Sequence, residues 1–258
     1  MQYPKDLIYI EEIKEITKIL KEVTENYINA KVKKRINKGC KDFYTDIDLN
    51  IEEEIMYKIS KKYPNDSFYT EETLKNSEFK ERTWTIDPID GTINYTNNIE
   101  LYTIQISLFD KTTPVLGFIY IPSENELFVG IKDNGAYLNG KKIEINKKEK
   151  LENSIITIDD ISTKDIRLRR KQKSVVTLMM DEALRIRIIG STGYNFSQLI
   201  ENKIGAHIIF SEKIWDLIPG ILISTEAGAV TNWDINKLND FSIIASNKEL
   251  LTEITNLF

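Results

Sequence analysis

The sequence contains a single cysteine, Cys40, and a single histidine, His207, among its 258 residues. One cysteine excludes an internal disulfide, which fits a reducing compartment. With no second histidine and no Gly-x-Ser-x-Gly motif, the chain gives no support to a Ser-His-Asp hydrolase. Cys40 has no histidine near it in the sequence, so thiol catalysis is not indicated either. His207 lies in an apolar stretch and is most simply a structural residue.

Signals for membranes and nucleic acids are missing as well. No apolar run approaches the roughly 20 residues of a membrane span, and the N-terminus has no charged-then-apolar signal pattern. The net charge of −5 and the pI near 5.3 argue against non-specific binding of nucleic acid, which needs a basic surface. Nucleotide loops of the G-x-G-x-x-G and G-x-x-x-x-G-K-[ST] types are absent. We therefore expect a cytoplasmic protein that binds neither membranes nor nucleic acid.

The first part of the chain predicts helices packed on an antiparallel sheet. Apolar positions at helical spacing predict an amphipathic helix over residues 6–29. A second stripe of isoleucines predicts a helix that begins near Asp46 and ends near Tyr63. Strands are expected over residues 67–73, 101–109, 115–121 and 126–131. The last three are separated by short turns, among them residues 111–114, and such turns imply antiparallel hairpins.

The second part alternates helices and strands after a polar joint at residues 146–152. The apolar pattern predicts strands over 154–159, 185–189, 206–210, 229–231 and 242–246. Helices are predicted over 174–184, from the turn at 190–195 to about 203, and over 215–226. The chain is thus expected to have two halves, residues 1–146 and 147–258, of which the second is the more typical of α/β folds.

The stretch Asp87-Pro88-Ile89-Asp90-Gly91-Thr92 is the most informative part of the sequence. Pro88 has no N–H and should interrupt the strand before it, and Gly91 permits a tight turn. Asp87 and Asp90 can then point at one place, beside the free N–H groups of Gly91 and Thr92. Carboxylates suit Mg²⁺, and free N–H groups suit a phosphate. The alternative is a strand-to-turn junction with two solvated acids.

Three further acids are candidates, and each has a plainer explanation. Asp48 stands near a helix start, where the helix dipole favours acids. Glu71 ends a strand, where an acid is usually solvated surface and where α/β folds also collect ligands. Asp216 follows Trp215 at another helix start and could be an N-cap. Asp46 opens a stretch that looks like an EF-hand loop, but the glycine and the bidentate glutamate of such loops are missing.

Four blocks in order resemble the inositol monophosphatase family, a family of Mg²⁺-dependent, lithium-sensitive phosphatases related to fructose-1,6-bisphosphatase. Residues 87–92 match its D-P-[IL]-D-G-T signature. Residues 42–48 are similar to its D-x-V-T-x-x-D block, and residues 67–72 resemble its G-E-E block. Residues 215–230 resemble its W-D…E-A-G-G block. The resemblance implies a layered αβαβα sandwich, with a mixed, largely antiparallel first half and an α/β second half.

The resemblance also implies a site. Two or three Mg²⁺ ions would be bound by Glu71, Asp87, the Ile89 carbonyl, Asp90 and Asp216. Asp48 with Thr92, and Glu71 beside them, would position and activate the attacking water. Contacts to the phosphate and the rest of the substrate are implied for Asp90, Gly91, Thr92, Ile93, Gly193, Tyr194, Asn195 and Asp216.

These roles agree with the chemistry. Four converging carboxylates would repel each other and a phosphate, and two or three Mg²⁺ ions would neutralise them. The motif offers no nucleophile other than water, so we expect direct attack by water without a phosphoenzyme.

The substrate is less clearly indicated. The segment before Trp215 is shorter than in the family, where an acid recognises inositol hydroxyls, and Glu212 is the nearest substitute. Inositol monophosphate is the leading substrate. NADP, fructose 1,6-bisphosphate and 3′-phosphoadenosine nucleotides are the alternatives, and a catalytically silent homologue that serves as an interaction partner is another. The resemblance implies a homodimer, for which residues 101–109 could supply an interface.

Overall fold

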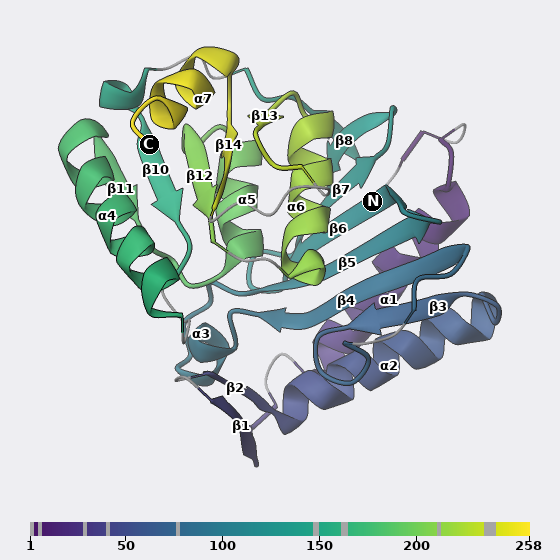
Figure 1. Ribbon diagram of the computed structural model, residues 1–258. Coiled ribbons are helices and arrows are strands. Elements are labelled where there is room, and N and C mark those ends of the chain that lie inside the picture. Colours follow the sequence, from purple (N-terminus) through teal and green to yellow (C-terminus); the bar gives the residue numbers. More distant parts are fainter. Residues whose placement is uncertain are drawn as a thin grey trace.

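A computed structural model describes residues 3–4, 7–27, 30–39, 42–75, 78–146, 150–160, 165–210, 213–234 and 241–258. Five layers follow one another in the order helix, sheet, helix, sheet, helix (Figure 1). The predicted layered αβαβα sandwich is therefore confirmed. Three apolar cores fill the spaces between the layers, and each core is formed by side chains at helical or alternating strand spacing.

The first sheet has seven strands, in the order β3-β4-β5-β6-β7-β8-β9. All neighbours are antiparallel except β3 and β4, so the predicted hairpins are confirmed. The strands are β3 (Ser67–Thr70), β4 (Arg82–Asp90), β5 (Thr103–Asp110), β6 (Thr113–Ile121), β7 (Glu126–Ile131), β8 (Gly135–Leu138) and β9 (Lys141–Ile143). Helices α1 (Ile10–Tyr27) and α2 (Asp46–Lys62) cover its outer face. A hairpin of β1 (Arg35–Gly39) and β2 (Asp42–Thr45) precedes α2.

The second sheet has five strands, in the order β11-β10-β12-β14-β13. Its strands are β10 (Ile155–Ile158), β11 (Arg185–Arg187), β12 (Ala206–Ile209), β13 (Val230–Thr231) and β14 (Ser242–Ala245). Strand β10 is parallel to both neighbours, whereas β14 is antiparallel to β12 and β13. Helices α4 (Ile166–Glu182) and α7 (Lys248–Thr255) pack on its outer face, and a short 3-10 helix, η1 (Leu151–Asn153), precedes β10.

The middle layer consists of α5 (Thr192–Ile200) and α6 (Ile214–Glu226). Helix α6 lies directly on the first sheet because β6 and β7 present glycines to it. A Cβ at Gly130 would lie 2.7 Å from the Ile223 Cα, and one at Gly117 would lie 2.9 Å from the Pro219 carbonyl oxygen. This close approach is what brings the first turn of α6, from the second half of the chain, next to the strands of the first half.

Several predicted boundaries are wrong. Strand β4 passes Pro88 and resumes its pairing at Asp90, because a bulge between Asp87 and Asp90 absorbs the residue that cannot donate. Thr113 and Pro114 belong to β6 and not to the turn. Helix α4 begins at Ile166, well before the predicted start at residue 174. The β1–β2 hairpin and α7 are not predicted by the sequence analysis.

Other expectations fall outside what the structure describes. Cys40 and Glu212 lie outside the described residues. Among the described residues, no helix has both the length and the hydropathy that a membrane crossing requires. The division of the chain into halves at residues 146 and 147 stays a prediction.

Candidate active site

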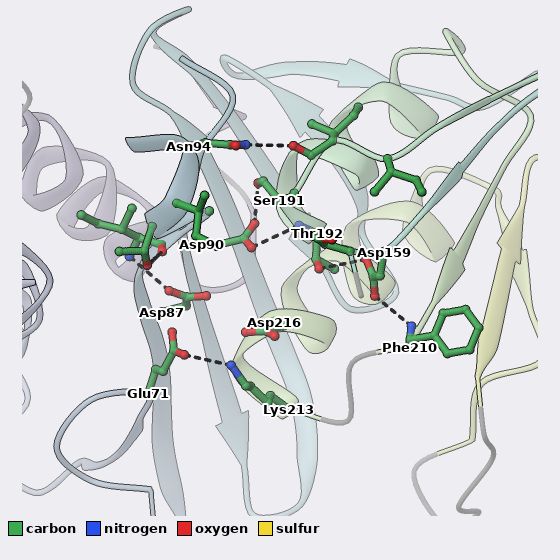
Figure 2. Close-up of a pocket in the computed structure, with 18 of the residues that line it drawn as sticks. Glu71, Asp87, Asp90, Asn94, Asp159, Ser191, Thr192, Phe210, Lys213 and Asp216 are labelled. Carbon is green, nitrogen blue, oxygen red and sulfur yellow. Dashed lines mark hydrogen bonds and ion pairs between the residues drawn. The ribbon is translucent and has the colours of Figure 1, made fainter. Parts of the chain in front are cut away.

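A cavity of about 550 Å³ lies where the two parts of the chain meet. Its walls come from the end of β4, from α3 (Thr92–Thr96), from the start of α6 and from the segment that follows β11 (Figure 2). Glu71, Asp87, Ile89, Asp90, Gly91, Thr92, Ile93 and Asp216, all predicted site residues, line it.

Three carboxylates converge on one side of this cavity. Glu71 follows β3, Asp87 stands in the bulge of β4, and Asp216 is in the first turn of α6. One ligand oxygen from each lies within 4.8 Å of the others. All three residues have less than a tenth of their surface exposed, and Asp87 is only 1% exposed. The Ile89 N–H donates to Asp87 Oδ1 over 3.1 Å, which holds that carboxylate in the bulge. We refer to Glu71, Asp87 and Asp216 as the acidic trio.

The electrostatics of the acidic trio favour a bound cation. Burial raises the pKa of Asp87 well above its ordinary value, and the negative charges of Glu71, Asp216 and Asp90 raise it further. A buried group of like charges with oxygen donors is the environment that a hard divalent cation neutralises. The residues present therefore fit a magnesium ion.

Two lysines approach the acidic trio from opposite halves of the chain. Lys38 of β1 and Lys213, the N-cap residue of α6, each place Nζ 2.9 Å from Glu71 Oε1. Although burial opposes it, the charges of Lys213 and Lys38 hold the pKa of Glu71 well below its usual range. Lys38 also lies 2.6 Å from Glu72 Oε1. Burial and the charge of Glu71 raise the pKa of Glu72 to about 7.

Asp90 points to a different set of partners. Its Oδ2 accepts from the hydroxyls of Ser191 at 2.7 Å and Thr103 at 2.9 Å, and from the Gly193 N–H at 2.6 Å. Its Oδ1 accepts from the Thr192 N–H at 3.1 Å. Burial raises the pKa of Asp90, and these donors oppose the rise. Asp90 thus ties the end of β4 to the start of α5, and it is not a member of the acidic trio.

Asp48 and Thr92 form a pair beside the cavity. The Thr92 hydroxyl lies 3.1 Å from Asp48 Oδ1 and 3.1 Å from the Ile89 carbonyl oxygen. Thr45 caps α2 and donates its N–H to Asp48 Oδ2 at 2.8 Å, forming a capping box that fixes the carboxylate. Asp48 is fully buried, and burial raises its pKa. For Asp48, the explanation as an acid at a helix start and the prediction of a catalytic role are therefore compatible.

The remaining predicted contacts are divided between the cavity and the protein interior. Gly91 has a φ of +98°, which an L side chain rarely adopts, and it begins α3. Ile93 lies at the cavity with 44% of its surface exposed. Gly193, Tyr194 and Asn195 do not line the cavity. The Tyr194 hydroxyl donates to Glu124 at 2.8 Å, and Asn195 is fully buried.

Sequence reasoning missed several residues of this site. Asn94 donates to the carbonyls of Leu101 and Ile189, at 2.7 and 2.9 Å, and so joins α3 to the second half. Asp159 accepts from the Thr192 hydroxyl at 3.1 Å and lines the cavity. Lys213 stands three residues before Asp216, so the block around Trp215 could have drawn attention to it. Nothing in the local sequence marks Lys38 as a partner of Glu71.

Comparison with known proteins agrees with this geometry. A model of the inositol monophosphatase family matches residues 5–258. The chain belongs to this family. Family membership confirms the resemblance seen in the sequence and makes the fold that of a phosphatase family.

Relatives of the family cover most of the chain. The Nus factor SuhB of Haemophilus influenzae is 29% identical over 241 residues, which are 91% of this chain and 89% of that protein. The fructose-1,6-bisphosphatase/inositol-1-monophosphatase of Aquifex aeolicus is 31% identical over 229 residues, or 88% and 85% of the two chains. Among solved structures, the IMPase of Thermotoga maritima matches with a TM-score of 0.83 at 24% identity, over 96% of each chain. That structural likeness supports the fold.

Proposed function

We propose that this protein is a Mg²⁺-dependent phosphomonoesterase that hydrolyses a small phosphorylated metabolite, with inositol monophosphate as the leading substrate. The observation that carries the proposal is the acidic trio, whose oxygens converge within 4.8 Å at the wall of a cavity. The Asp48–Thr92 pair beside it adds a proton acceptor. Family membership supports the phosphatase class.

The metal site of the proposal consists of the acidic trio, Asp90 and the Ile89 carbonyl, with two or three Mg²⁺ ions. Mg²⁺ in this position supplies the positive charge that neutralises the acids, attracts the phosphate and activates water at neutral pH. The acids come from β3, β4 and α6, so the two halves of the chain must stay docked for the site to exist.

Asp48 and Thr92 position the attacking water and accept its proton. When the Thr92 hydroxyl donates to Asp48 Oδ1, 3.1 Å away, its oxygen can accept a hydrogen bond from a water in the cavity that Thr92 lines. A water that donates to this oxygen is held in line, and its proton can pass through the hydroxyl to Asp48. Because burial raises the pKa of Asp48, this carboxylate is a better proton acceptor than an exposed aspartate.

The phosphate end of the substrate is bound at the start of α3. The N–H groups of Gly91 and Thr92 are the proposed phosphate donors, and Ile93 contacts the rest of the substrate at the mouth of the cavity. The proposal leaves Tyr194 and Asn195 without a substrate contact because neither lines the cavity. The same phosphate site would serve all candidate substrates, so the distal part of the cavity decides among them.

Inositol monophosphate leads because a relative named inositol monophosphatase, from Dictyostelium discoideum, is 31% identical over 214 residues. The Aquifex relative's name favours fructose 1,6-bisphosphate as a second candidate. NADP and 3′-phosphoadenosine nucleotides stay open as alternatives. We include in the proposal a homodimer and inhibition by lithium, which the family resemblance implies. A cytoplasmic location is also proposed, and the single cysteine agrees with a reducing compartment.

The test is phosphate release from these four substrates during a Mg²⁺ titration. We expect Mg²⁺-dependent release from wild-type protein and from an Asp110→Asn control, whose acid lies exposed at the end of β5. Asp87→Asn should abolish release without unfolding the protein, because asparagine can still accept the Ile89 N–H. If no substrate is hydrolysed by folded, Mg²⁺-saturated protein, the interaction-partner alternative takes its place. Salt-sensitive RNA binding would then be its first test.

A further inference from the structure

Lys213 places a positive charge beside the carboxylates of the proposed metal site. Its Nζ lies 2.9 Å from Glu71 Oε1, and Glu71 shares the acidic trio with Asp87 and Asp216 (Figure 2). Lys213 is the N-cap residue of α6 and stands three residues before Asp216, so both side chains start from the same end of that helix. The four blocks that resemble the family do not include this position.

The geometry points to Lys213 as a built-in counter-ion that a divalent cation must displace from Glu71. This inference rests on the proposed metal site and concerns how that site fills. The three carboxylates carry a charge of −3 when ionised, and an ammonium at 2.9 Å from one of them offsets part of their repulsion. A cation that binds Glu71 would meet the repulsion of that ammonium. Lys213 therefore stabilises the ion-free protein and weakens its affinity for Mg²⁺.

Lys213 is better suited to leave the trio than Lys38 is. The side chain of Lys213 is 46% exposed and lines the cavity, so its ammonium has accessible space beside it to move into. The side chain of Lys38 is 14% exposed and has a second partner, Glu72 at 2.6 Å, that would hold it in place after Glu71 binds an ion. The displacement is therefore assigned to Lys213 alone.

The test compares Lys213→Met with a matched control, Lys203→Met. Lys203 forms an ion pair of 2.8 Å with Glu201, and its side chain is 49% exposed, so the two lysines differ mainly in their proximity to the acidic trio. The measurements are the melting temperature in EDTA and the Mg²⁺ dissociation constant by calorimetry. Neither depends on turnover.

We expect Lys213→Met to lower the melting temperature of the ion-free protein and to tighten Mg²⁺ binding about tenfold, or about 1.4 kcal/mol. Lys213→Arg keeps the charge and should retain the wild-type Mg²⁺ affinity. Lys203→Met should leave the Mg²⁺ affinity unchanged. If Lys213→Met fails to fold, Lys213→Gln replaces it in both measurements, with the same expected shifts.

Any other outcome of the Mg²⁺-binding measurements overturns the inference. An unchanged or weaker Mg²⁺ affinity in Lys213→Met would mean that the lysine only supports the structure or contacts substrate. Equal tightening in Lys203→Met would mean that general surface charge is responsible. An absence of Mg²⁺ binding in all variants would refute the metal site together with the lysine's role. Lack of phosphatase activity with the expected Mg²⁺ shifts would refute only the proposed reaction.

Discussion

Asp87→Asn should have opposite effects on this protein with and without Mg²⁺. Without the metal, Asp87 is a buried acid next to two others, so the ionised carboxylate destabilises the folded state. Asparagine keeps the shape and can still accept the Ile89 N–H, but it removes the charge. With Mg²⁺ present, the same substitution removes a proposed ligand. The variant should therefore be more stable than wild type in EDTA and should gain little from added Mg²⁺.

The separation of the acids sets the size of the effect. Two full charges 4.8 Å apart, the upper limit within the acidic trio, repel by about 3.5 kcal/mol at an effective dielectric constant of about 20. The ammonium of Lys213 beside Glu71 offsets part of this repulsion. We therefore expect the substitution to stabilise the ion-free protein by about 1–3 kcal/mol, and a melting temperature higher by roughly 2–10 °C.

The effect should depend on pH in one direction. The pKa of Asp87 is raised in the folded state, so the protein retains this part of its stability below the unfolded pKa of about 3.9. It loses that stability as the pH rises from the unfolded pKa through the raised pKa, because the unfolded chain has already released the proton that the folded state still holds. The Asp87→Asn variant has no titrating group at this position, so its stability lacks this pH dependence. The gap between variant and wild type should widen from pH 5 to pH 8.

Thermal unfolding monitored by circular dichroism at several pH values, in EDTA and in Mg²⁺, measures all three effects. Wild-type protein at about 100 times the Mg²⁺ dissociation constant should gain about 2.7 kcal/mol, and the variant should gain much less. A variant that is less stable than wild type in EDTA at pH 8 would refute the reasoning. So would a Mg²⁺ stabilisation equal to that of wild type.

Three other substitutions test the parts that hold the site. Gly220→Ala places a Cβ against the Phe196 ring between α5 and α6, so it should destabilise the protein by about 1–3 kcal/mol or more in urea unfolding; wild-type stability would show that the middle layer is loosely packed. Gly193→Ala forces a Cβ against the Thr103 hydroxyl, with Asp90 Oδ2 3.0 Å away, so it should lower the melting temperature and, by shifting Asp90, lower kcat at least about tenfold; a normal kcat would mean that the position of Asp90 does not matter. Thr45→Val removes the side-chain cap of α2, so it should lower the free energy of unfolding by about 0.5–2 kcal/mol and reduce kcat. A loss of stability with full kcat would show that Asp48 does not need Thr45 to orient it.

The fold was largely predictable because its layers follow simple patterns. The isoleucines of α1 and α2 repeat at helical spacing and face the first sheet, and the short turns between β5, β6 and β7 specify antiparallel hairpins. The start of α4 was missed because its first eight residues are mostly charged, and Leu168 is the one apolar residue of that stretch that packs on the core. Helix α7 was missed although Leu250 and Ile254, four residues apart, are both buried.

The candidate site was only partly predictable. The signature at residues 87–92 indicated that Asp87 and Asp90 point to one place, but the two carboxylates, on either side of the bulge in β4, contact different partners. Asp87 joins Glu71 and Asp216, whereas Asp90 accepts from donors about 100 residues away in the chain, at the start of α5. No local pattern reveals such partners, because they depend on how the two sheets dock. The same holds for Lys38.

The most direct test of the account is to locate a divalent ion in crystals of the protein grown with Mn²⁺ in place of Mg²⁺. An anomalous difference map identifies the ion without relying on activity. The account predicts a strong peak within bonding distance of Glu71, Asp87 and Asp216, and its loss in Asp87→Asn crystals. Carboxylates that stay paired with Lys213 and Lys38 at saturating Mn²⁺, with no peak between them, would contradict the account.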